Sequence, residues 1–186
     1  MPTAQTVVDQ AFQRCRLLAR LVELEYERAR AYPTDARYVD LGVLEIGKKQ
    51  EKVKALVQIE AAFGDLIALV EHLTILDMAA AFERLFATRV ATAVGAARKT
   101  LKERHRYLTL ASREKLVRET KDFEGLNDIA TLIEADLSQE VKELLKIIRE
   151  NRNKFSHGTD IQNPPTILKE DARAALNEAI ALLQPV

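Results

Sequence analysis

Hydrophobic side chains recur at steps of three and four residues along most of the chain, the spacing of one face of an α-helix. The first such series consists of Val7, Val8, Phe12, Cys15, Leu18, Ala19, Val22 and Tyr26. Stretches that alternate polar and apolar residues, as half-buried strands require, are missing. With only 6 glycines and 5 prolines to interrupt the helices, the pattern predicts an all-α protein.

A second helical run begins near Lys48 and is expected to continue to about Arg106, in pieces, with a weak point at Gly64. A break at residues 32–34 and a loop over residues 42–47 separate it from the first run. Its apolar stripe is broad enough for a buried central helix and consists of Leu66, Leu69, Val70, Leu73, Leu76, Ala79, Phe82, Phe86 and Val90.

The C-terminal part of the chain predicts further helices. A short charged run covers residues 112–121, and another piece covers residues 129–135. A strong amphipathic helix then carries Leu137, Val141, Leu144, Leu145, Ile148 and Phe155, and the last helix, residues 167–183, carries Leu168, Ala172, Leu176, Ile180 and Leu183. The architecture we expect is an up-and-down bundle of four to five main helices. We interpret residues 1–186 as one domain, with residues 1–60 as a helical extension and 61–186 as the core.

Composition and charge limit the functional classes. The 186 residues are 47% hydrophobic and 30% charged, as in a soluble globular domain, and the formal net charge is +0. Global charge therefore does not indicate a nucleic-acid or membrane partner. No uncharged stretch is long enough to span a bilayer, and the single cysteine, Cys15, excludes an intrachain disulfide. We expect a cytoplasmic protein without a membrane partner, in which Cys15 fills a half-buried position.

Metal and cofactor sites find little support in the sequence. The three histidines, His72, His105 and His157, lack the spacing of a helical zinc or di-iron site. No glycine-rich phosphate loop, nucleophile elbow or dinucleotide fingerprint is present. We therefore predict no metal and no cofactor, and expect His72 to be a surface or core side chain of its helix.

The segment from Asn151 to Gly158 departs from generic amphipathic helix. Arg152 and His157 enclose four residues. An arginine fork can hold a phosphate, and an imidazole can exchange a proton near neutral pH. Together they are two of the parts needed to cleave RNA without a metal, through attack by the 2′-hydroxyl on the adjacent phosphate.

The spacing alone is common in a chain with sixteen arginines, and Arg98 with His105 forms a second such pair. That pair lies in a run dense with charge, which we interpret as a solvated basic face. The 152/157 pair differs in context, since it follows a well-formed apolar helix, includes the apolar anchor Phe155, and precedes a helix-ending Gly158.

The segment LLKIIRENRNKFSHG resembles the signature of HEPN domains, in which an arginine, often followed by a polar residue, precedes a histidine near the end of a late helix. The segment ILDMAAAFERLFATRV is similar to another helix of many members, and Glu83 matches its glutamate. The alternative for Glu83 is a surface carboxylate paired with a neighbour such as Arg84. The resemblance implies a helical bundle that dimerises so that two motifs form one composite cleft.

By this resemblance, Arg152 would bind the scissile phosphate, His157 would be general base or acid, and Asn153 would orient the histidine or contact the phosphate. Arg149 and Lys154 lie beside the motif as RNA-binding candidates. Many family members are endoribonucleases that act as toxins or in antiviral defence, and an inhibitory antitoxin partner would fit that branch. Others are non-catalytic interaction or RNA-binding modules, in which Arg152 would pair with Glu150 or another acid and the helix end would be a structural cap.

Positive charge beyond the motif is a further candidate contact for RNA. Between Arg98 and Asp122 the chain has nine lysines and arginines against four acids, which could follow a phosphate backbone. The alternative is a solvated charged face. Tyr107 is the only aromatic residue in this stretch, which argues against a stacking platform for single strands.

Overall fold

The computed structural model describes residues 6–44, 52–104, 136–156 and 167–182. These residues form α1 (Val7–Ala31), α2 (Arg37–Asp40), α3 (Lys52–Arg104), α6 (Gln139–Ser156) and α7 (Lys169–Leu182). No strand occurs within these ranges, so the prediction of an all-α protein is confirmed. The helical pieces expected at 112–121 and 129–135 lie outside the described residues.

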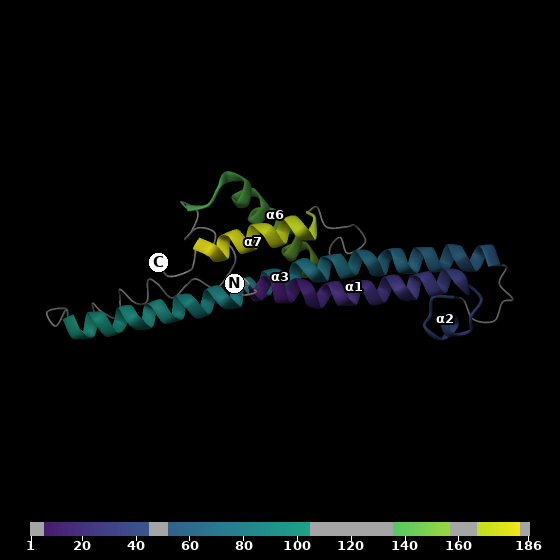
Figure 1. Cartoon of the computed structure of the whole chain (residues 1–186), viewed down its shortest axis with the longest axis horizontal. Helices are drawn as coiled ribbons and strands as arrows, with labels where there is room; N and C mark the ends of the chain where they lie inside the picture. Colours follow the sequence, from purple (N-terminus) through teal and green to yellow (C-terminus); the bar gives the residue numbers. More distant parts are fainter. Residues whose placement is uncertain (1–5, 45–51, 105–135, 157–166, 183–186) are drawn as a thin grey trace, which may run out of the picture.

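Helices α1 and α3 lie side by side and run in opposite directions, and α6 and α7 lie together on one side of this pair (Figure 1). The Thr6 side chain starts α1 by accepting a hydrogen bond from the backbone of Asp9, and the Asp9 carboxylate accepts one from the backbone of Thr6. This reciprocal capping box satisfies two otherwise unpaired amides at the helix start. Two contacts fix the register of α1 on α3, one between Arg14 and Asp77 and one between the rings of Tyr26 and Phe63.

Helix α3 is one continuous helix of 53 residues, where the sequence led us to expect pieces. Gly64 does not interrupt it. A glycine inside a helix costs only about 1 kcal/mol relative to alanine, and the packing on either side of Gly64 outweighs that cost.

The sequence did not predict helix α2, a single turn in the connection after α1. Its Tyr38 is fully buried, and the phenol donates a hydrogen bond of 3.0 Å to Glu25 of α1. Gly42, with φ of 72°, then turns the chain through a left-handed conformation that side chains with a Cβ disfavour.

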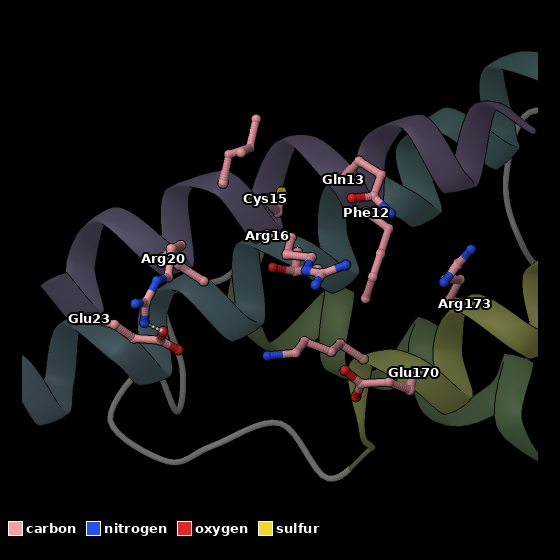
Figure 2. Close-up of a pocket in the computed structure, with 12 residues that line it drawn as sticks. Phe12, Gln13, Cys15, Arg16, Arg20, Glu23, Glu170 and Arg173 are labelled. Carbon is pink, nitrogen blue, oxygen red and sulfur yellow. Dashed lines mark hydrogen bonds and ion pairs between the residues drawn. The ribbon is translucent and has the colours of Figure 1, made fainter. Parts of the chain in front are cut away.

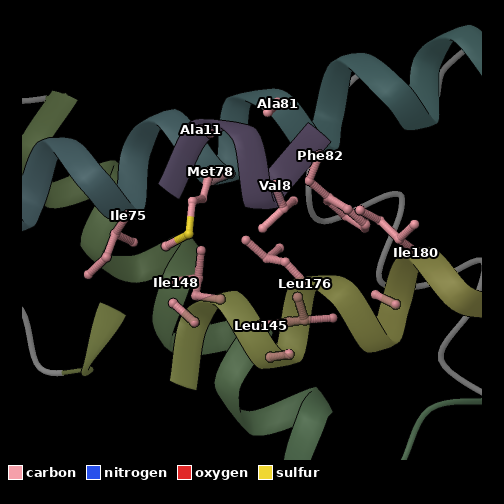
Figure 3. Packing of buried hydrophobic residues seen from close by; sticks show 14 of the residues in the cluster. Val8, Ala11, Ile75, Met78, Ala81, Phe82, Leu145, Ile148, Leu176 and Ile180 are labelled. Atoms are coloured by element: carbon pink, nitrogen blue, oxygen red, sulfur yellow. The ribbon is translucent and has the colours of Figure 1, made fainter. Parts of the chain in front are cut away.

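Two hydrophobic clusters lie at different points along α3. The larger one joins all four long helices, and Figure 3 shows its side chains converging from α1, α3, α6 and α7, with Met78, Phe82, Ile148 and Leu176 among the most buried. The smaller one joins α1, α2 and the first part of α3 around Tyr38, Ile59 and Phe63. Because the larger cluster draws on helices far apart in the sequence, it fixes the position of α6 against α3.

Some positions assigned to buried stripes are exposed. Leu18, Leu66 and Leu73 each keep more than a third of their surface exposed, because α6 and α7 cover α1 and α3 from one side only. Leu168 was also expected to face the core but is 69% exposed, and the neighbouring Ile167 is buried in its place. No helix in the described part of the chain is both long and apolar enough to cross a membrane.

Candidate functional site

Helix α6 carries Arg152 at the edge of its buried face. Val141, Leu145 and Ile148 recur at helical spacing and lie in the larger cluster, and Ile148 is fully buried. Arg152 follows Ile148 by four residues, so its side chain begins on the same side of the helix. The preceding Asn151 is also buried, and its amide donates a hydrogen bond of 2.9 Å to the carbonyl of Ile147, one turn back.

Arg152 forms an ion pair with Glu83 of α3. Its Nη1 lies 3.0 Å from Oε1 of Glu83, whose side chain is only 15% exposed, while that of Arg152 is 39% exposed. Glu83 reaches this position because the adjacent Phe82 is buried in the larger cluster and sets the rotation of α3. The structure thus brings together two site residues that the sequence had named on separate segments.

Phe155 of α6 packs against His72 of α3. The ring centroids of Phe155 and His72 are 5.5 Å apart at an interplanar angle of 31°. His72 is buried, as one of the two alternatives for it predicted. The only signal in the sequence was a histidine within an apolar helical stripe, which does not reveal its partner.

The remaining site candidates divide into two groups. Asn153 and Lys154 are exposed at the end of α6, and Arg149 is half-buried. His157 lies outside the described residues, immediately after the last residue of α6, Ser156. Most of the basic stretch 98–122 also lies outside them.

A separate cleft lies between α1 and the start of α7. Its cationic lining residues are Arg16, Arg20, Lys169 and Arg173. Figure 2 shows Arg16, Arg20 and Glu23 on α1 and Glu170 and Arg173 on α7 around this cleft. Three of the cations pair with acids, Arg20 with Glu23 at 3.0 Å, Lys169 with Glu71 at 3.5 Å and Arg173 with Asp9 at 2.7 Å. Since these acids offset most of the positive charge, the cleft is a weak attractor for anions.

Cys15 lines the same cleft and is half-buried, as expected. Burial raises the pKa of its thiol, and a hydrogen bond with Thr74 only partly opposes that effect. A raised pKa keeps the sulfur in the unreactive thiol form near neutral pH. This agrees with the interpretation of Cys15 as a packing residue.

No group of three or more histidine, cysteine, aspartate or glutamate side chains within the described ranges could hold a metal ion. Comparison of the chain with protein-family models, with curated proteins and with solved structures finds no match in any of the three. The resemblance to HEPN domains therefore depends on the motif residues themselves.

The chemical capacity of the site follows from its charges and position. A guanidinium has five N–H donors in a plane, so one nitrogen can bond a carboxylate while others remain directed elsewhere. An anchored arginine at a helix end can hold a phosphate in a fixed orientation. The ion pair itself contributes at most about 1 kcal/mol to stability, because it is partly open to solvent.

Proposed function

We propose that the protein is a metal-independent endoribonuclease of the HEPN type, with Arg152 and His157 as its catalytic pair. The observation that carries the proposal is the contact of 3.0 Å between Arg152 and Glu83. It joins the arginine of the motif to Glu83, the acidic residue that the resemblance to HEPN domains places beside it. A carboxylate in this position would hold the guanidinium plane in place before substrate binds, which is a form of preorganisation.

In the proposed reaction, a base removes the proton of the RNA 2′-hydroxyl and its oxygen attacks the adjacent phosphorus. The bond from phosphorus to the 5′-oxygen breaks, and that oxygen receives a proton from an acid. The products are a 2′,3′-cyclic phosphate and a 5′-hydroxyl end. His157 serves as base or acid, Arg152 stabilises the charge on the phosphoryl oxygens, and Asn153 orients the histidine or contacts the phosphate.

Arg149 and Lys154 supply positive charge beside the reacting phosphate in this proposal. The composite cleft, in which a second copy contributes its own motif, is part of the same proposal, as is a role as a toxin or phage-defence protein held silent by an antitoxin. Toxic expression of the intact chain, relieved by His157→Ala, would support that last role.

The test is incubation of end-labelled RNA with the purified protein in EDTA. The parent should leave 2′,3′-cyclic phosphate ends. His157→Ala and Arg152→Ala should each reduce the cleavage rate by about 100-fold or more. Lys146→Ala is the matched control, since it removes an exposed cation from the same helix and should cleave as the parent does. No cleavage by the parent, or undiminished cleavage by His157→Ala, would contradict the proposal.

Glu83→Gln separates positioning from a merely structural role. The amide keeps the shape of the side chain but loses the charge that holds Arg152. We expect a lower turnover number with a melting temperature lowered by no more than a few degrees, since the ion pair contributes at most about 1 kcal/mol. Glu143→Gln, an exposed acid on α6, is its control.

A non-catalytic interaction or RNA-binding module is the second candidate. It is favoured by the packing of Phe155 on His72, because that contact and the ion pair could both serve only to hold the end of α6 on α3. For such a module, Arg152→Ala would lower stability modestly, and the parent would bind RNA or a protein partner without cleaving RNA.

A further inference from the structure

A leucine array runs along mostly exposed positions of α1 and α3, and Leu17, at one end of it, also borders the cleft between α1 and α7. On α1, Leu17, Leu21 and Leu24 follow one another at steps of four and three residues, so they share one face of the helix. Leu17 is 70% exposed and Leu21 is 64% exposed, the highest values among the leucines of this helix. So large a fraction of apolar surface left on adjacent turns indicates a covering partner.

Helix α3 carries a second row of leucines, which corresponds to the row on α1. Leu66, Leu69 and Leu73 recur at steps of three and four, and Leu66 and Leu73 keep more than a third of their surface exposed. Lys169 of α7 pairs with Glu71, which lies two positions from both Leu69 and Leu73. Residues two apart point to nearly opposite sides of a helix, so this row faces away from α7.

The register of the two helices sets the two rows side by side. Arg14 pairs with Asp77 at 2.9 Å, and the rings of Tyr26 and Phe63 are 5.3 Å apart. Between these two contacts, residues at the same level on the antiparallel helices can be paired by counting along each chain. This places the leucines in three layers: Leu17 with Leu73, Leu21 with Leu69, and Leu24 with Leu66.

The ion pair also shows that both rows lie on the same face. Arg14 precedes Leu17 by three residues and Asp77 follows Leu73 by four, so each charge continues the row of its own helix. Three leucine layers on two antiparallel helices, closed at one end by a pair of opposite charges, form half of a four-helix bundle.

We propose that this leucine array is the contact between two copies of the chain. The two copies are related by a two-fold axis that runs parallel to α1 and α3. This rotation places α1 of each copy against α3 of the other and keeps every residue at the same height along the axis. Each leucine layer then meets the identical layer of the partner, and each Arg14 lies over the partner's Asp77. The face is therefore complementary to itself in apolar surface and charge, as an isologous interface requires.

This contact does not depend on the proposed ribonuclease function. Glu83 lies ten residues beyond Leu73, about 15 Å along α3, and its ion pair is with α6. The composite cleft of the proposed function would use a different surface of the molecule. If both contacts form, loss of the leucine contact halves the mass of the assembly and leaves the two copies that share the cleft together.

The experiment measures the mass of the full-length protein in solution by light scattering over a range of concentrations. The parent should have at least twice the mass of one chain. Leu17→Glu and Leu21→Glu should each halve that mass, or weaken association by about 30-fold or more, because a carboxylate would be buried without a partner. Helicity should stay the same, since both positions are exposed in the single chain.

Val53→Glu is the matched control. Val53 is 70% exposed, as Leu17 is, but lies at the start of α3 outside the array, so this variant should keep the mass of the parent. Leu17→Gln is a milder variant that removes the apolar side chain without adding charge, and should also weaken association.

A parent with the mass of one chain at every concentration would overturn the proposal, because the array would then be covered within the chain or by another protein. An unchanged mass in both leucine variants would overturn it too. If the masses change as expected while the parent cleaves no RNA, only the proposed function fails.

Discussion

At the scale of single residues, Asp9 ties the start of α1 to α7. Its carboxylate accepts hydrogen bonds from Nε of Arg173 at 2.7 Å, from Nδ2 of Asn177 at 3.0 Å and from the backbone of Thr6 at 3.2 Å. Burial alone would raise the pKa of Asp9, but these hydrogen bonds outweigh it and hold the pKa below its usual 3.8. The ionised form is thus favoured in the folded protein.

We expect Asp9→Asn to lower the free energy of unfolding near neutral pH by about 1–2 kcal/mol, through loss of charge-assisted hydrogen bonds. The pKa of Asp9 is lower in the folded protein than in the unfolded chain. The ionised carboxylate therefore stabilises the fold above about pH 3.8, and this stabilisation is lost as the pH falls through the pKa of the folded state. The difference in stability between parent and variant should therefore shrink in acid.

Urea unfolding at several pH values measures this difference. Asp65→Asn, at an exposed position of α3, is the control and should differ little from the parent at any pH. A difference for Asp9→Asn that stayed constant down to strongly acidic pH would show that the charge of Asp9 is not what stabilises the contact.

At the scale of elements, α3 shows packing overriding local propensity. Gly64 lies inside the helix, and a Cβ added there would meet nothing within 4 Å. The helix continues through it because Ile59 and Phe63 before it and Val70 after it are buried in the smaller cluster. The glycine therefore makes no contact that the fold needs, and it lowers stability by giving the unfolded chain more conformational entropy.

Gly64→Ala should raise the free energy of unfolding by about 0.5–1 kcal/mol, since it removes backbone freedom without a clash. Gly42→Ala is the informative counterpart. The space around Gly42 is equally open, but its φ of 72° strains an alanine, so we expect destabilisation by about 1 kcal/mol. Thermal unfolding of the two variants would reveal opposite shifts, and equal shifts would contradict this account.

At the scale of the whole molecule, α3 connects two cores that different helices complete. The larger cluster depends on α6 and α7, and the smaller one on α2 and the later part of α1. Among the described residues the two clusters share only α1 and α3, so damage to one need not open the other.

Ile59→Ala should cost about 2–4 kcal/mol, because Ile59 is fully buried in the smaller cluster. Hydrogen exchange should become faster in α2 and the later part of α1 and stay unchanged in α6 and α7. Ile148→Ala, in the larger cluster, should give the reverse pattern. Uniformly faster exchange in both variants would mean that the two cores open as one cooperative unit.

The sequence by itself determined the helical class, the extents of α1, α6 and α7 to within a few residues, and the candidate motif around Arg152. These features depend on periodicity and on helix breaks, which are local. Asn153 and Lys154 are exposed as polar helix-end residues usually are, and the division into an N-terminal extension and a core stays a prediction, as does the role of His157.

Only the tertiary structure decided which faces meet. Periodicity shows that a helix has an apolar face but not what covers it, so the sequence could not distinguish the buried Phe82 from the exposed Leu73 on the same stripe. The continuity of α3, the burial of Tyr38 and the contact between Arg152 and Glu83 all depend on segments distant in sequence. Such contacts arise because burying apolar surface rewards particular pairings of helices, and that free energy belongs to the packed molecule as a whole.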